Sequence, residues 1–297
     1  MKYTDILGNE KVKDILKKAV QHNTVLHSYL FVGEEGIGKS LFAKEFAKSI
    51  LCLGKEKPCE ACKSCIEIEE NNQPDYIEIV PDGNSIKIEQ IRNMQLKVAE
   101  KPIVSTKKVY VIQEADTMTQ EAQNALLKTL EEPPEYATII LIGNNENAFL
   151  NTIKSRCMII NFKPIDKEKI QQYMEQNYQM YDLHSNMLDA FQGSIGKAIQ
   201  LKDKKEQYEK VEETIEKLDK KDIIDIISMS EDIYKDKDEI ANILEYIEII
   251  LLKLAQKEVK YANCIRIVED TKKRLSQNAN YDMCIDNMIF NMWEEVI

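Results

Sequence analysis

The stretch SYLFVGEEGIGKS, residues 28–40, decides the fold class of this 297-residue chain. Its first part, Tyr29–Val32, is a short apolar run typical of a buried strand, and the SLFAKEFAKSI that follows from Ser40 has the composition of a helix. The residues between them match the phosphate-loop pattern G-x-x-x-x-G-K-[ST] at Gly33, Gly38, Lys39 and Ser40, and Gly36 is a further glycine inside the loop.

The residue types in this loop suit phosphate chemistry. Glycines let backbone N–H groups turn toward phosphate oxygens, Lys39 reaches the outer phosphates, and Ser40 holds magnesium. The competing interpretation is a glycine-rich turn with an exposed lysine, but a strand before the loop and a helix after it favour the functional one. We therefore expect ATP or ADP to bind here with magnesium.

Further strand-like runs extend the pattern outward from this loop. YIEIV, KVYVI, ATIILIG and MIINF alternate with amphipathic stretches up to residue 162, which predicts an α/β domain with a mainly parallel sheet. From residue 166 onward every segment has helical periodicity. We expect a small helical unit over residues 163–204 and an all-helical domain over residues 205–297.

The last helix of that domain carries two apolar stripes. Ile285, Met288, Ile289 and Met292 fall on one face, and Met283, Phe290 and Ile297 form a second stripe. A helix buried deep in its own domain and a subunit interface both account for such a wide apolar arc.

Composition excludes several classes of function. With 43% hydrophobic residues the chain fills real cores, and no run of apolar residues is long enough to span a membrane. The formal charge of −11 opposes strong unaided binding to DNA phosphates. The first residues do not form a signal peptide, so we expect a cytoplasmic protein.

Four of the seven cysteines lie within residues 52–65: Cys52, Cys59, Cys62 and Cys65. Four thiolates complete the tetrahedral shell of a zinc ion and leave no position for a substrate, so a structural zinc module is favoured over a catalytic one. The alternatives are small core residues or a redox pair.

The stretch KVYVIQEADTM, residues 108–118, ends a strand in an acidic cluster. Nucleotide-hydrolysing sites place an Asp that supports magnesium at the end of such a strand, but Gln113 stands there and carries no negative charge. Glu114 is either a base that polarises water or a solvated acid. Asp116 or Thr117 is a candidate cap for a helix over residues 119–131, with Thr117 and Gln120 as a capping-box pair.

Two further polar groups follow later strands. Asn144, directly after the strand TIILIG, is placed to sense a γ-phosphate. Arg156, in the stretch NTIKSRC, is by chemistry alone either a solvated surface residue or a phosphate contact.

Taken together, the four-cysteine module and several stretches of this chain resemble the clamp-loader branch of the AAA+ ATPases. The stretches are DILGNEKVKDILKKAV, HSYLFVGEEGIGKS, KVYVIQEADTMTQEAQNALLKTLEEPP and NTIKSRC. The likeness covers residues 1 to about 200, and only helical character supports it beyond.

The resemblance implies an AAA+ P-loop module over residues 1–162 with the zinc module inserted, a helical lid over 163–204 and a collar domain over 205–297 that joins subunits. In that family tau/gamma-type motor subunits, a delta-type subunit and a stationary subunit form a five-membered ring. The ring uses ATP to load a sliding clamp onto primed DNA for DNA polymerase III. The resemblance places Asn144 at the sensor and Arg156 at an arginine finger that acts in trans.

Three departures from the motor subunits imply the stationary, non-hydrolysing role. Gln113 replaces the metal-side acid, and Gly196 stands where motors carry a second sensor arginine. The chain also ends after a collar-sized domain, without a polymerase-binding extension. The competing hypotheses are a self-sufficient AAA+ ATPase, either a motor subunit or a recombination-associated one, and a zinc-dependent DNA-binding module.

Overall fold

The computed structural model describes residues 3–222 and 237–297. The chain divides into two compact units, one formed by Met1–Lys169 with Gly193–Lys197 and the other by Ile170–Gln192 with Ala198–Ile297. The domain boundaries at 162 and 204 that the sequence suggested stay predictions, and residues 223–236 of the predicted collar lie outside the described ranges. Within those ranges no helix combines the length and the apolarity needed to cross a bilayer.

The first unit is built on a five-stranded sheet in which every pairing is parallel, with the strand order β2-β3-β4-β1-β5. The strands are β1 Ser28–Val32, β2 Tyr76–Ile79, β3 Lys108–Ile112, β4 Ala137–Gly143 and β5 Met158–Asn161. The predicted α/β class with a parallel sheet is confirmed. Since β3, β4 and β1 are neighbours, the residues that follow them meet at one edge of the sheet.

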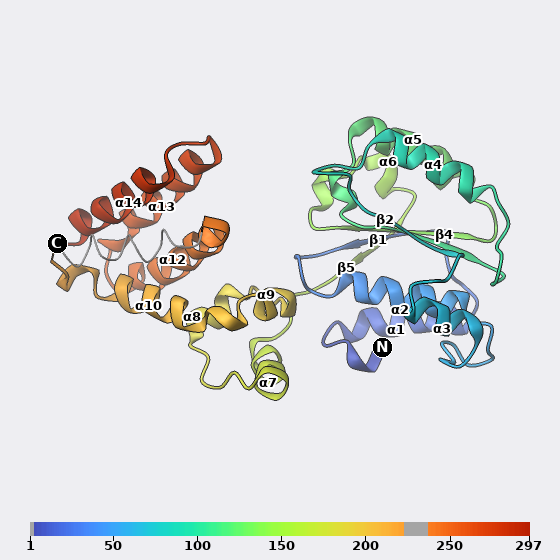
Figure 1. Cartoon of the computed structure of the whole chain (residues 1–297), viewed down its shortest axis with the longest axis horizontal. Helices are drawn as coiled ribbons and strands as arrows, with labels where there is room; N and C mark the ends of the chain where they lie inside the picture. The colour runs from blue at the N-terminus through green and yellow to red at the C-terminus, as the bar shows by residue number, and fades with distance from the viewer. Residues whose placement is uncertain (1–2, 223–236) are drawn as a thin grey trace. The chain divides into compact units, whose positions relative to one another are not determined.

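Helices cover both faces of the sheet (Figure 1). One layer contains α1 Glu10–Gln21, α2 Lys39–Leu51 and α3 Lys63–Glu69, and the other contains α4 Ile88–Val98, α5 Gln120–Glu131 and α6 Asn151–Lys154. Three short 3-10 helices complete the unit: η1 Tyr3–Asp5, η2 Ala115–Thr117 and η3 Glu146–Ala148.

Two apolar cores form because successive strand side chains point to opposite faces. Leu30, Tyr110 and Leu141 pack in one cluster with Leu126 and Leu130 of α5. On the other face aromatic rings dominate: Tyr29 lies edge-on to Phe46 with centroids 5.1 Å apart, and Phe42 lies 5.0 Å from Phe162. The two cores hold the sheet between its helical layers.

The second unit is all helical in the part that the structure describes. Its elements, including two that cross the division between the units, are α7 Lys167–Tyr178, α8 Ser185–Ala190, α9 Ile195–Gln200, η4 Lys202–Lys204, α10 Lys205–Glu216, η5 Leu218–Lys220, η6 Lys237–Glu239, α12 Ile240–Ala255, α13 Tyr261–Ser276 and α14 Tyr281–Val296. The buried carboxylate of Glu212 ties three of them together, since it accepts hydrogen bonds from Asn186 of α8 and Tyr246 of α12.

The two stripes predicted for α14 differ in burial. Ile285, Met288, Ile289 and Met292 are buried, as expected of a core face. Met283 and Ile297 of the second stripe are 62% and 73% exposed, so no other part of the described chain covers them. An interface on this second stripe remains a prediction.

The carboxylate of Asp75, just before β2, organises the loop that leads into β3. It is fully buried and accepts backbone N–H groups from Ile103, Val104 and Ser105, each at 2.7 Å. One side chain therefore satisfies three consecutive donors of an irregular segment, which fixes that loop beside β2.

We expect Asp75→Ala to lower the free energy of unfolding by about 2–4 kcal/mol, because it leaves several N–H groups without their acceptor. Chemical denaturation followed by circular dichroism measures the change. Asp82→Ala is the matched control, since the Asp82 side chain is 76% exposed and its change should stay near zero. Equal stability of the two variants would contradict this role of Asp75.

Candidate functional site

The predicted phosphate loop joins the end of β1 to the start of α2. Gly36 and Gly38 adopt φ angles of +70° and +101°, a region that residues with a Cβ rarely enter. At Gly33 a Cβ would lie 2.9 Å from Cβ of Phe162, so the loop also needs a glycine where it passes β5. These three positions explain why the sequence uses glycine here.

The ammonium group of Lys39 lies inside this loop. Its Nζ donates to the carbonyl oxygens of Gly33 and Glu34, both at 2.7 Å, and to Oδ1 of Asn144 at 2.8 Å. Burial lowers the pKa of Lys39, and the negative charges of Asp116, Glu34 and Glu35 oppose that shift. The loop and Asn144 therefore already hold the Lys39 ammonium at the position where it would contact a bound phosphate.

Ser40 and Gln113 meet at the same edge of the sheet. The Ser40 hydroxyl donates to Oε1 of Gln113 at 2.7 Å. The side chain that follows β3 is thus within reach of the serine predicted to hold magnesium, but it offers a neutral amide oxygen where a carboxylate would add charge.

These residues line an open cavity of about 450 Å³. Its walls are Glu35, Gly36, Gly38, Lys39, Ser40, Leu41, Gln113, Glu114, Ile142 and Asn144. Glu114 lines the cavity with a left-handed backbone, φ +46°. The structure therefore brings the predicted loop, Glu114 and Asn144 together around one space, although their roles toward a nucleotide remain predictions.

The segment Gly193–Lys197 packs directly on the loop. The N–H of Gly196 donates to the carbonyl of Gly36 at 2.9 Å, and a Cβ on Gly196 would lie 2.7 Å from Cα of Gly36. At Gly36 an added Cβ would lie 2.5 Å from Oγ of Ser194. An arginine at position 196 is therefore incompatible with this arrangement of the backbone.

The capping residue predicted for the helix after the acidic cluster was wrong. α5 begins at Gln120, and its N-cap is Thr119, whose side chain accepts the N–H of Ala122. Thr117 instead donates its hydroxyl to the carbonyl of Glu114 within η2. The reason is that η2 occupies residues 115–117, so the chain enters the helix two residues later than the capping-box pattern suggested.

Arg156 lies between α6 and β5, away from the cavity walls. Its guanidinium donates to Oε1 of Glu131 at 2.6 Å and to the carbonyl of Thr152 at 2.9 Å, and the side chain is 33% exposed. Within the described chain the guanidinium is thus held by a neighbouring acid and stays accessible to solvent. A contact with a phosphate of another subunit remains a prediction.

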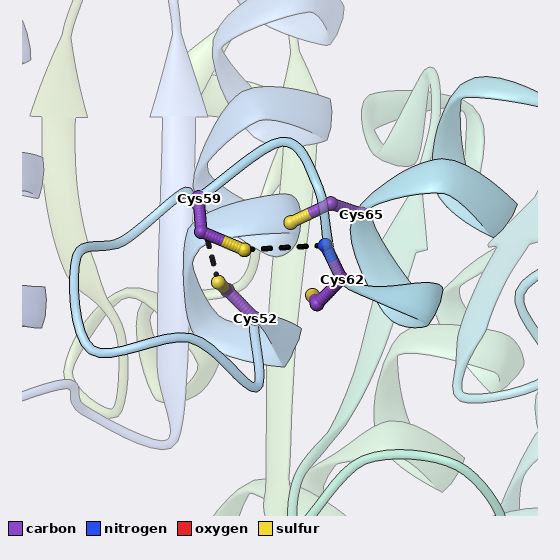
Figure 2. A group of neighbouring side chains, drawn as sticks. All are labelled: Cys52, Cys59, Cys62 and Cys65. Atoms are coloured by element: carbon purple, nitrogen blue, oxygen red, sulfur yellow. Dashed lines mark hydrogen bonds between the residues drawn. The ribbon is translucent and has the colours of Figure 1, made fainter.

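The four cysteine sulfurs gather at one point between the end of α2 and the start of α3 (Figure 2). All four Sγ atoms lie within 4.8 Å of one another, and tetrahedral zinc with Zn–S bonds of about 2.3 Å needs separations of about 3.8 Å. The N–H groups of Cys59 and Cys62 donate to Sγ of Cys52 and Cys59, each at 3.3 Å. N–H donors lower the pKa of Cys59 to about 6. This donor set fits zinc after a shift of about 1 Å.

A buried lysine connects this module to α2. Lys48, 2% exposed, pairs with Glu69 at the end of α3 at 2.5 Å and lies within 4 Å of Glu45 and Glu60. Its hydrogen bond lowers the pKa of Glu69 to about 2, whereas burial raises the pKa of Glu45 to about 7. Sequence reasoning missed this cluster. Its signal was a Glu-x-x-Lys pair inside a helix whose other residues are largely apolar.

Comparisons with known proteins show which family this chain belongs to. The model of the family described as "DNA polymerase III, delta subunit" matches residues 8–166. The chain is 37% identical over 200 residues to DNA polymerase III subunit delta' of Bacillus subtilis (strain 168), which covers 66% of this chain and 60% of that protein. It is 31% identical over 297 residues to subunit tau of the same organism, which covers 97% of this chain and 49% of that protein.

A solved structure extends the likeness to the fold. A DNA polymerase III gamma subunit-related protein from Thermotoga maritima superposes with a TM-score of 0.52 at 19% identity, over 95% of this chain and 99% of the other. The predicted fold class, an AAA+ module followed by helices, is confirmed. The chain spans only 60% and 49% of the two Bacillus relatives' lengths.

We expect the purified protein to contain one zinc ion, and replacement of Cys52, Cys59, Cys62 and Cys65 by serine to remove it. Zinc stabilises zinc-finger peptides by about 10–16 kcal/mol, so the loss of stability should exceed the about 1 kcal/mol typical of one substitution. Elemental analysis and thermal denaturation measure both effects. Cys157→Ser, outside the module, is the control; a metal-free wild type would contradict the prediction.

Proposed function

The chain belongs to the DNA polymerase III delta-subunit family, in the clamp-loader branch of the AAA+ proteins, and from this premise we propose that it is the stationary, delta-prime-type subunit of a clamp loader. In this role it binds adenine nucleotide without hydrolysing it. It assembles in the cytoplasm with motor and delta-type subunits in a five-membered ring that loads a sliding clamp onto primed DNA.

The hydrogen bond between Ser40 and Gln113 carries the non-hydrolysing part of the proposal. A divalent cation beside the phosphates is favoured by a carboxylate that adds negative charge, and catalysis of phosphoryl transfer depends mainly on such electrostatic placement. Gln113 supplies an oxygen without charge. The loop thus keeps the groups that bind phosphate but lacks the one that supports a catalytic metal.

The contact between Gly36 and Gly196 supports the same conclusion. A motor of this family would place an arginine at position 196 to contact the γ-phosphate, but a Cβ at this position would lie 2.7 Å from Cα of Gly36, which leaves no room for it. Two charges useful for hydrolysis are therefore missing, one on the metal side and one on the phosphate side.

Arg156 gives the chain a chemical role toward a neighbouring subunit. A guanidinium stabilises charge on a transferring phosphoryl group with two parallel N–H donors, and it can be supplied in trans. In this structure Glu131 and the carbonyl of Thr152 hold the partly exposed guanidinium, so these contacts must open before it contacts another chain. We propose that Arg156 completes the ATP site of an adjacent motor subunit.

A self-sufficient ATPase is the second candidate, because the alignment with the tau subunit of Bacillus subtilis covers 97% of this chain. The same phosphate loop serves both functions, and Glu114 lines the cavity in either case. The turnover of the purified chain distinguishes them. A zinc-dependent DNA-binding module is disfavoured by the net charge of −11.

We expect the purified chain to bind ADP and ATP with magnesium. Its turnover number for ATP should lie far below about 1 s⁻¹, the low end of the range typical of enzymes. Lys39→Ala should weaken binding at least about 10-fold, because the outer phosphates lose their ammonium. Lys44→Ala on the same helix is the control, since Lys44 pairs with Asn71 and not with the loop. Turnover at about 1 s⁻¹ that Lys39→Ala abolishes would establish the second candidate instead.

We expect Arg156→Ala to leave folding and nucleotide binding of this chain unchanged, and to slow hydrolysis at the one neighbouring site by about 10³-fold or more. Clamp-loading rates of rings assembled to equal extent measure the effect. Arg156→Lys should fail to restore the rate, because an ammonium cannot make the bidentate contact. Glu131→Gln is the second control and should preserve the loading rate, since it removes only the ion pair that holds Arg156. If rings with Arg156→Ala load the clamp as fast as wild-type rings, Arg156 is only a surface charge.

A further inference from the structure

Asp116, in η2 after β3, hydrogen-bonds to the backbone of the segment that follows the neighbouring strand β4. Its Oδ2 accepts the backbone N–H groups of Asn144 at 2.8 Å and Asn145 at 3.1 Å. One carboxylate oxygen thus fixes two consecutive peptide units directly after the strand ends at Gly143. The sequence had suggested Asp116 only as a helix cap.

The approach of the two segments depends on a glycine. At Gly143 an added Cβ would lie 3.3 Å from Cβ of Asp116 and 2.7 Å from the ring of Phe149. The end of β4 is therefore packed between the aspartate and an aromatic ring. This packing leaves the backbone at Asn144 little freedom once Asp116 holds its N–H.

The position of Asn144 matters because its side chain reaches the phosphate loop. Its Oδ1 accepts a hydrogen bond from Nζ of Lys39 at 2.8 Å. Its neighbour Asn145 has a different task, since its Oδ1 accepts the N–H of Asn147 and caps η3. The hydrogen bonds from both peptide units to Asp116 therefore determine that Asn144, and not Asn145, faces Lys39.

The negative charge of Asp116 also favours the protonated form of Lys39. Burial lowers the pKa of Lys39, and Asp116 is the largest of the influences that raise it. Oδ1 of Asp116 is buried and, among the described residues, has no hydrogen-bond partner. Asp116 is absent from the cavity walls, so in this structure it reaches the nucleotide space through Asn144 and Lys39.

We propose that Asp116 is a positioning residue that aims the Asn144 side chain at the outer-phosphate end of the loop, and so sets the preference of this chain for ATP over ADP. Asn144 contacts Lys39 when the loop is empty and the γ-phosphate when ATP is bound. Without Asp116 the Asn144 amide loses its fixed direction, and the contact that only ATP can make is weakened. The inference rests on the proposed nucleotide binding.

The first test needs no nucleotide. Hydrogen exchange of the Asn144 and Asn145 amides, followed by NMR, should speed up at least about 5-fold in Asp116→Ala, because both N–H groups lose their acceptor. Asp116→Asn retains an acceptor oxygen and should restore slow exchange. Glu146→Ala, which removes a different acid from the same segment, is the control and should leave both amides unchanged.

The second test compares the affinities of these proteins for ADP and for a slowly hydrolysed ATP analogue, ATPγS. Asp116→Ala should lower the preference for ATPγS about 5- to 10-fold with a smaller effect on ADP, and Asp116→Asn should retain most of it. Asn144→Ala should show the same loss. In the double variant the two losses should not add, since both remove one contact.

Unchanged exchange in Asp116→Ala, equal losses for both nucleotides, or additive losses in the double variant would each overturn the inference. If Asp116→Ala does not fold, Asp116→Ser is the second variant: its hydroxyl is one bond shorter than the carboxylate, so it should show the same faster exchange and the same loss of preference. If the wild type binds neither nucleotide, the proposed function fails, and the exchange measurement decides by itself whether Asp116 holds the segment.

Discussion

The buried ammonium of Lys39 is the interaction on which the candidate site depends. It joins the loop after β1, through the carbonyls of Gly33 and Glu34, to the residue after β4, through Asn144. The parallel register, which pairs Val32 with Gly143, makes this possible because both strands end at the same edge of the sheet. A cation in a confined space with only neutral oxygens as direct partners is a strong binding group for an anion.

The proposed division between nucleotide binding and hydrolysis rests on where the acids lie around this cation. The side chain that hydrogen-bonds to Ser40 is the neutral Gln113. The negative charge of Asp116 instead acts on Lys39 and favours its protonated form. In the proposed function, charge placed there would favour a contact between Lys39 and phosphate. The guanidinium of Arg156 lies outside the cavity, paired with Glu131 and partly exposed to solvent. The proposed chemistry therefore divides between a binding site in this chain and a group offered to another.

The cysteine module is joined to α2, the helix that begins at Lys39, by covalent and by electrostatic links. Covalently, Cys52 follows α2 directly, and Cys62 is the N-cap of α3. Electrostatically, Lys48 of α2 pairs with Glu60, which lies between the cysteines, and with Glu69, which follows them. A loop with few apolar residues gains its order from such ion pairs and, in our proposal, from zinc. Its position at the far end of α2 from Lys39 makes a structural role the simplest interpretation.

The sequence by itself determined the α/β class, the phosphate loop and the cysteine cluster, because each depends on residue types at short spacing: alternating apolar runs, glycines beside Lys39, and thiols within one loop. It also marked Gln113 as a departure. Only the tertiary structure decided which groups meet. Residues that follow different strands, such as Asp116 and Asn144, become neighbours through the parallel strand order, and no short-range pattern records that distance. The contact of Gly36 with Gly196 likewise depends on chain segments 160 residues apart, so a local pattern could flag Gly196 but could not supply the steric reason for it.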